Sequence, residues 1–147
     1  MKRIIEWILA GIGTILCIGG AAFLWSPQAA SNPPGVSIWP MPGLLLIGVT
    51  LLGLLGFAGI AYEPDQSASR WVILTWITCG GLLGLSIFGE FAVSAIALLG
   101  VPALFFGAAA IIADGRRKRK MLPDFGVLIM SGIVAIGLLF AFIIFGR

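Results

Sequence analysis

Long apolar stretches separated by short polar segments make up most of this 147-residue chain. Five such stretches can be drawn, over about residues 4–25, 44–62, 71–88, 91–113 and 125–145. A helix needs about 20 apolar residues to cross a bilayer core, so each stretch can span a membrane. Strands of a transmembrane barrel would alternate polar and apolar positions, whereas these stretches are apolar all round. The pattern therefore predicts an all-α fold, a polytopic transmembrane helical bundle of five spans forming one domain over residues 1–147.

The composition leaves almost no material for a soluble domain. The chain is 60% hydrophobic and 10% charged, with a mean hydropathy of +1.13. Soluble domains carry charges on about a quarter of their residues. We therefore expect the spans to make up nearly the whole protein.

The basic residues predict the orientation of the chain in the membrane. Eight of the nine lie in three places, namely Lys2 with Arg3, Arg70, and the run 116–120. Short loops rich in Lys and Arg stay in the cytoplasm. Five spans with the N-terminus inside put all three places in the cytoplasm and the C-terminus, with Arg147, outside.

Residues 71–113 form the longest nearly uninterrupted apolar region. As one helix, these 43 residues would extend for about 65 Å, twice the thickness of a bilayer core. One helix would also put the basic run 116–120 outside. We therefore expect a tight hairpin that turns at Gly89-Glu90.

Aromatic side chains lie near the ends of the expected spans. Trp7, Trp25, Trp39, Tyr62 and Trp71 take such positions, and Trp76 lies further inside the third span. Amphipathic rings prefer the headgroup region, so these positions agree with the predicted span ends.

The first span is expected to be an uncleaved signal anchor. Its apolar part has 22 residues, against about 7–15 in a signal peptide, and Gln28 occupies the −3 position of the nearest small-residue site. Cleavage is the alternative. The absence of organellar targeting features favours a multi-pass protein of the bacterial plasma membrane, that is, the inner membrane.

Small residues recur at helical spacing within the spans, and the clearest pair is Gly80 with Gly84. Small faces let helix backbones approach closely in lipid. We interpret them as internal packing of the bundle, with a helix–helix interface to another subunit at Gly80 and Gly84 as the alternative.

Pro102 lies in the middle of the expected fourth span. It cannot donate a hydrogen bond to the carbonyl of Leu98, so a kink is expected there. The kink is either a static bend or a hinge.

Two acidic residues lie closest to the expected bilayer. Glu6 is expected at the inner headgroup level, with Lys2 or Arg3 as a partner one turn earlier. Glu90 is expected to be solvated at the tip of the hairpin. Either residue becomes a coupling site for a proton or cation if it lies deeper, because a charge inside the bilayer is costly.

The basic run is the densest group of charges in the chain. It consists of Arg116, Arg117, Lys118, Arg119 and Lys120. Its expected role is to hold the 114–124 loop inside, and it is also expected to contact anionic lipid headgroups, at about 1 kcal/mol per basic residue. Nucleic-acid binding is not expected, because one short run makes few phosphate contacts.

No signature of catalysis or of cofactor binding occurs in the chain. Histidine is absent, and Cys17 and Cys79 lie in different spans without a second ligand. Nucleotide-binding and hydrolase motifs are also missing. We therefore expect no catalytic residue, no metal and no cofactor, and a protein that is not an enzyme.

The segment Trp39-Pro40-Met41-Pro42-Gly43 enters an apolar helix, which is followed by a compact hairpin and the basic run. Over residues 39–120 this arrangement resembles a loose group of small bacterial multipass membrane proteins with no assigned activity. The resemblance implies a bacterial polytopic protein and carries no activity to this chain.

These observations favour a non-enzymatic structural or accessory component of a membrane assembly. The alternative is a small transporter or channel that works as an oligomer. The polar residues available to line a path are Glu90, Thr50, Thr75, Thr78 and Ser94.

Overall fold

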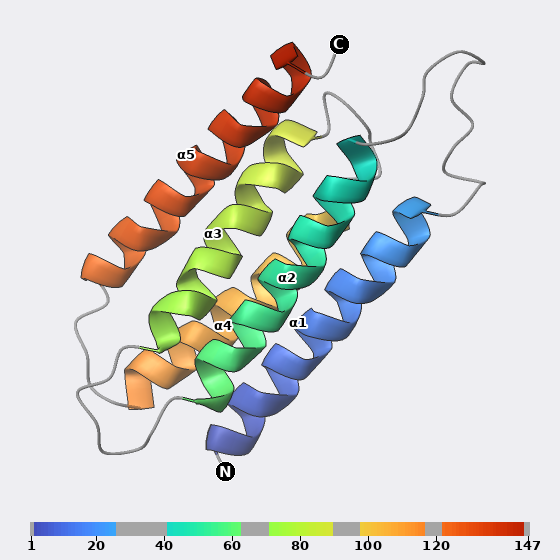
Figure 1. Cartoon of the computed structure of the whole chain (residues 1–147). Helices are drawn as coiled ribbons and strands as arrows, with labels where there is room; N and C mark the ends of the chain where they lie inside the picture. The colour runs from blue at the N-terminus through green and yellow to red at the C-terminus, as the bar shows by residue number, and fades with distance from the viewer. Residues whose placement is uncertain (1, 26–40, 63–70, 90–97, 117–121, 146–147) are drawn as a thin grey trace.

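The computed structural model describes residues 2–25, 41–62, 71–89, 98–116 and 122–145. They form five helices, which are α1 (Lys2–Trp25), α2 (Met41–Ala61), α3 (Val72–Gly89), α4 (Gly100–Arg116) and α5 (Leu122–Phe145) (Figure 1). The described residues contain no strand. The prediction of an all-α chain with five helices is confirmed.

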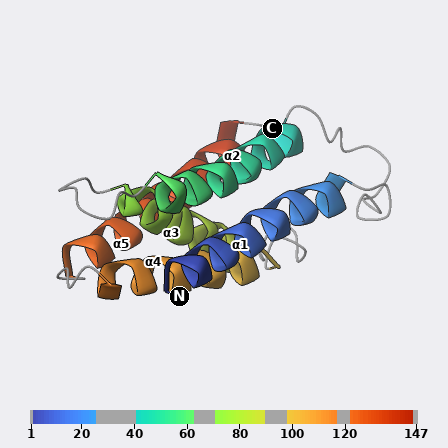
Figure 2. The same cartoon turned by 90° about the horizontal axis from the view of Figure 1, so that it is seen from below.

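Helices α1 to α4 form a four-membered ring in which each packs against the next. Helix α1 contacts α2, α2 contacts α3, α3 contacts α4, and α4 returns to α1 (Figure 2). Helix α5 lies outside this ring and packs against α3. Successive helices run in opposite directions, so α1, α3 and α5 begin at the same end of the bundle (Figure 1).

The interior of the ring is filled by an aromatic side chain from α4. Phe106 is fully buried and its ring reaches both α1 and α2. A Cβ atom on Gly13 would lie 3.1 Å from this ring, and one on Gly56 would lie 2.7 Å from it. A side chain at position 56 would therefore overlap the aromatic ring, and one at position 13 would lie in tight contact with it.

Threonine hydroxyls connect α2 to its two neighbours. Thr14 of α1 donates to the carbonyl of Ala10 in its own helix over 2.8 Å and makes a longer contact of 3.3 Å with the carbonyl of Gly53 in α2. From α3, Thr75 donates to Gly56 over 3.0 Å and Thr78 donates to Leu52 over 2.9 Å. An apolar interior provides no water as an acceptor, so these backbone carbonyls satisfy the buried hydroxyls.

Helices α3 and α5 meet along the face that contains Gly80 and Gly84. A Cβ atom on Gly84 would lie 2.7 Å from the carbonyl oxygen of Gly132, and one on Gly80 would overlap the carbonyl of Leu128 and the hydroxyl of Ser131. The structure therefore uses this glycine pair for close packing inside one chain.

The start of α4 differs from the sequence prediction. Leu98 and Leu99 form a short 3₁₀ turn and α4 begins at Gly100, whereas the expected stretch began at residue 91. Pro102 consequently lies in the first turn of α4, where its missing N–H removes no helical hydrogen bond. The expectation of a mid-helix kink at Pro102 was wrong. Residues 90–97, which include Glu90 and the expected turn of the hairpin, lie outside the described residues.

One described helical stretch, Arg3–Phe23 of α1, is both long and apolar enough to cross a membrane. It lies near the N-terminus, where a signal sequence has similar properties. Three shorter apolar helical stretches are Ile47–Ala61, Val72–Ile87 and Phe125–Leu138.

Candidate functional site

The charged side chains that the structure describes lie at one end of the bundle, the end where α1 and α3 begin and α4 ends in Figure 1. We call this the charged end. Among the side chains that the structure describes, the charged ones are Arg3, Glu6, Asp114 and Arg116. All four belong to the first two turns of α1 or the last turn of α4.

An ion pair joins α1 to α4 at the charged end. The Nε of Arg116 donates to Glu6 Oε1 over 2.8 Å, and its Nη2 donates to Oε2 over 3.0 Å. The Glu6 side chain is 2% exposed and that of Arg116 is 20% exposed. A guanidinium that meets both carboxylate oxygens forms a strong and geometrically specific pair. The contact connects residues 110 positions apart in the sequence.

A second buried hydrogen bond joins α3 to α4. The indole Nε1 of Trp76 donates to Asp114 Oδ2 over 2.8 Å, and both residues are buried. An indole N–H has only a donor function, so it requires an acceptor when it is removed from water. Glu6, Trp76, Asp114 and Arg116 together form what we call the polar cluster.

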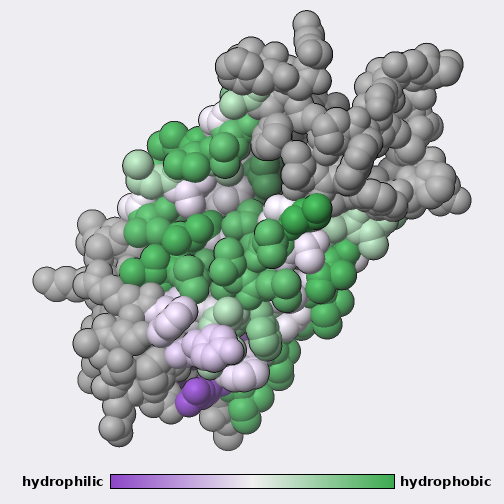
Figure 3. All heavy atoms as spheres, in the orientation of Figure 1, coloured by the Kyte–Doolittle hydropathy of each residue, from purple (hydrophilic) through white to green (hydrophobic). Residues whose placement is uncertain are grey.

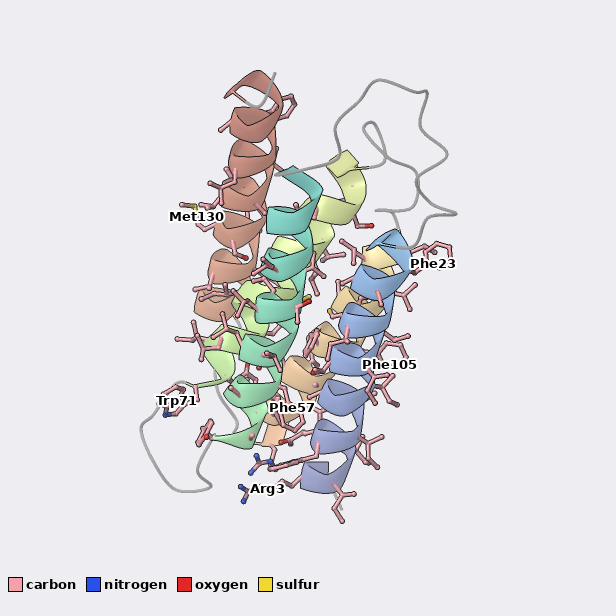
Figure 4. All side chains as sticks on the ribbon, turned by 45° about the vertical axis from the view of Figure 1, so that its right-hand side comes forward. Arg3, Phe23, Phe57, Trp71, Phe105 and Met130 are labelled. Atoms are coloured by element: carbon pink, nitrogen blue, oxygen red, sulfur yellow. The ribbon has the colours of Figure 1, made fainter. Side chains whose placement is uncertain are left out.

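Aromatic side chains surround the polar cluster at the same end. Trp7 meets Phe57 edge to face with ring centroids 5.5 Å apart, and Tyr62 lies 6.0 Å from Trp71. Figure 4 shows Arg3, Phe57 and Trp71 near this end, and Phe23 near the other. Trp7, Tyr62 and Trp71 are exposed, as amphipathic rings at a membrane interface would be.

The structure gives Glu6 a different partner from the expected one. The sequence suggested Lys2 or Arg3, one turn earlier on the same helix, whereas the observed ion pair is with Arg116. Arg116 was expected to contact lipid as the first residue of the basic run, and in the structure its guanidinium also pairs with Glu6. Arg117, Lys118, Arg119 and Lys120 lie outside the described residues.

Sequence reasoning missed Asp114 and noted of Trp76 only that it lies further inside the third span than the other aromatic residues. The expected fourth span ended at Ala113, which put Asp114 in a loop, but α4 continues to Arg116. A signal was present, because Asp114 extends a row of buried residues at helical spacing. That row is Leu99, Ala103, Phe106, Ala110 and Asp114.

The arrangement offers ion pairing and hydrogen bonding between helices. Within the described part of the chain, no group of three or more His, Cys, Asp or Glu residues could hold a metal ion. Cys17 and Cys79 are buried free thiols on different helices. The observed bonds therefore supply contacts that position α1, α3 and α4 relative to one another.

Comparison of the chain with known protein families, with curated proteins and with solved structures finds no match.

Proposed function

We propose that the chain is an integral membrane protein in which all five helices cross the bilayer. The observation that supports this most directly is the distribution of exposed and buried side chains. Each helix exposes large apolar residues, including Ile15 on α1, Leu51 on α2, Ile87 on α3, Leu104 on α4 and Ile133 on α5. Figure 3 shows apolar side chains over the middle of one face and a hydrophilic patch at the charged end. Soluble monomers rarely expose apolar patches larger than a few hundred square ångströms.

The polar side chains in the interior of the bundle support the same proposal. Glu6, Thr14, Thr75, Thr78 and Asp114 are buried, and each makes at least one hydrogen bond to a neighbouring helix. A surface of apolar groups around an interior of bonded polar groups suits a hydrocarbon solvent. The helices, of 17 to 24 residues, are about 25–36 Å long, against about 30 Å for the bilayer core.

In the proposed orientation the charged end faces the cytoplasm of a bacterial cell and the C-terminus lies outside. The basic residues at the charged end support this orientation, because short segments rich in Lys and Arg stay in the cytoplasm. A periplasm-dependent reporter fused after Arg147 should be active, and the same reporter inserted after Gln66 should be inactive. Cytoplasmic location of the Arg147 fusion would overturn the five-span orientation.

For its role, we propose a non-enzymatic structural or accessory component of a membrane assembly. The filled ring supports this role over that of a transport path, since Phe106 occupies its interior and Thr75 and Thr78 donate to carbonyls of α2. The large apolar exterior offers area for contact with lipid and with other membrane proteins.

Purification in a gentle detergent, followed by mass spectrometry of co-purifying proteins, tests this role. A membrane-protein partner at constant stoichiometry is the expected result. Recovery of a stoichiometric homo-oligomer alone would contradict the accessory role and favour an oligomeric transporter or channel. A Phe106→Leu variant serves as a control, because altered packing of the ring interior should leave capture of an external partner intact.

The basic run is proposed to bind anionic lipid headgroups on the cytoplasmic side. Each basic residue near an anionic surface contributes about 1 kcal/mol. Native mass spectrometry with added phosphatidylglycerol should show bound lipid, and replacement of residues 117–120 by glutamine should remove it. Equal lipid binding by that variant would contradict the proposed contact.

A further inference from the structure

The last turn of α4 is held from two sides. Asp114 and Arg116 are two positions apart, and residues at that spacing point in nearly opposite directions around a helix, about 200° apart. Asp114 accepts a hydrogen bond from Trp76 of α3, and Arg116 pairs with Glu6 of α1. Both bonds require this turn to stay helical as far as residue 116, so each supports the conformation on which the other depends.

We propose that the polar cluster acts as one latch, in which the Glu6–Arg116 ion pair and the Trp76–Asp114 hydrogen bond open and close together. Helix ends fray readily because their last four carbonyls lack partners within the helix. Two contacts on opposite sides of the last turn oppose such fraying. The latch also holds the residue at which α4 ends, and Arg116 is both that residue and the first of the basic run in the sequence.

The two side chains of the ion pair differ in the cost of losing their partner. Glu6 is almost fully buried, whereas Arg116 keeps part of its surface exposed at the end of a helix. Without Arg116, a carboxylate would stay buried without its counter-charge, which is costly. Without the charge of Glu6, the guanidinium can turn toward water. Arg116→Gln should therefore open the latch more than Glu6→Gln.

The indole N–H signal of Trp76 reports on the latch without touching Glu6. The chain has five tryptophans, so ¹⁵N-labelled protein in lipid nanodiscs should give five indole signals, and Trp76→Phe identifies the one that belongs to Trp76. A hydrogen bond to a carboxylate shifts this signal from the position of an unbonded indole. Arg116→Gln should move or broaden the Trp76 signal, and Glu6→Gln should do so to a smaller extent.

Arg119→Gln is the matched control, because it removes the same charge from the same run and should leave the Trp76 signal unchanged. The latch is overturned if the Trp76 signal stays in place in both Arg116→Gln and Glu6→Gln. It is also overturned if Arg119→Gln moves the signal as far as Arg116→Gln does, because the effect would then belong to the charge of the run.

A double-mutant cycle gives a second test that needs only the milder variants. Glu6→Gln and Asp114→Asn each remove one charge and keep the side-chain size. If the two bonds open together, the loss of melting temperature in the double variant should be clearly smaller than the sum of the two single losses. Additive losses would show that the two bonds act independently and would contradict the proposal that they form one latch.

Discussion

Helices α4 and α5 are both apolar, but they are held in the bundle by different means. Helix α4 closes the ring through a buried aromatic ring, an ion pair and a hydrogen bond to an indole. Helix α5 lies against α3 through the close approach of its backbone to Gly80 and Gly84. None of the α5 side chains that the structure describes is fully buried, and Met130 points away from the bundle in Figure 4.

The difference separates two sources of helix association, polar bonds in the ring and close backbone packing between α3 and α5. Polar bonds and complementary shapes specify which helices are neighbours in the ring, because few partners can satisfy a buried carboxylate. Close backbone packing needs only small residues and dispersion contacts. The ring should therefore be sensitive to loss of individual side chains, whereas the α3–α5 contact should be sensitive to added volume.

Phe106→Ala should have the largest effect on the ring. It removes an aromatic side chain that contacts both α1 and α2, and truncation of a buried phenylalanine costs about 3–5 kcal/mol. Equilibrium unfolding in mixed micelles should show this loss, and hydrogen exchange should rise in α1, α2 and α4. A loss below about 1 kcal/mol would mean that the ring is held together mainly by other contacts.

Arg116→Gln should have the second largest effect. It should lower the free energy of unfolding by about 3 kcal/mol, in the lower part of the range for breaking a buried ion pair. Partial exposure of Arg116 to solvent weakens the pair relative to a fully buried one. Glu6→Gln should cost less in the same unfolding measurement. Equal losses below about 1 kcal/mol for both variants would mark the pair as an ordinary surface salt bridge.

The sequence predicted the helical parts of this fold well, because long apolar stretches without alternation of polar and apolar positions favour helices over strands. The ends of α1, α2, α3 and α5 fall within about three residues of the expected limits. The predicted start of α4 was wrong because an apolar stretch contains no change of polarity that would mark a helix boundary. Pro102 was the available start signal, and it was interpreted as a kink.

The polar cluster could be predicted only in part. Asp114 lies in register with a row of residues that includes Phe106 and Ala110, so its burial could have been predicted from this spacing alone. Its partner Trp76 and the pairing of Glu6 with Arg116 depend on which helices become neighbours in the ring. Hydrophobic patterning of this kind is nearly uniform around each helix, so it does not specify neighbours.

Gly84→Ala should lower the stability of the protein less than the two preceding variants do, and its effect should be confined to the α3–α5 contact. The new Cβ atom would lie 2.7 Å from the carbonyl oxygen of Gly132, so the two backbones must separate. Such overpacking costs about 1–3 kcal/mol. Hydrogen exchange should increase in α5 while α1, α2 and α4 keep their protection.

Gly137→Ala is the control for this variant, because no atom lies within 4 Å of the position that its Cβ would occupy. It should be neutral or slightly stabilising, since alanine favours a helix more than glycine does. Equal destabilisation by both substitutions would show that close packing at Gly84 is not what holds α5.

Thr78→Val should have the smallest effect, because it removes one hydrogen bond while keeping the shape of the side chain. Thr78 donates to Leu52 of α2 over 2.9 Å and also contacts Leu74 of its own helix over 3.0 Å. Hydrogen bonds between membrane helices contribute about 0.6 kcal/mol on average, so a loss of this size is expected in unfolding measurements. Thr78→Ser keeps the hydroxyl but loses the methyl group that lies against Gly56. A greater loss for Ser than for Val would show that shape outweighs the polar bond even within the ring, and the contrast between α4 and α5 would then be one of degree.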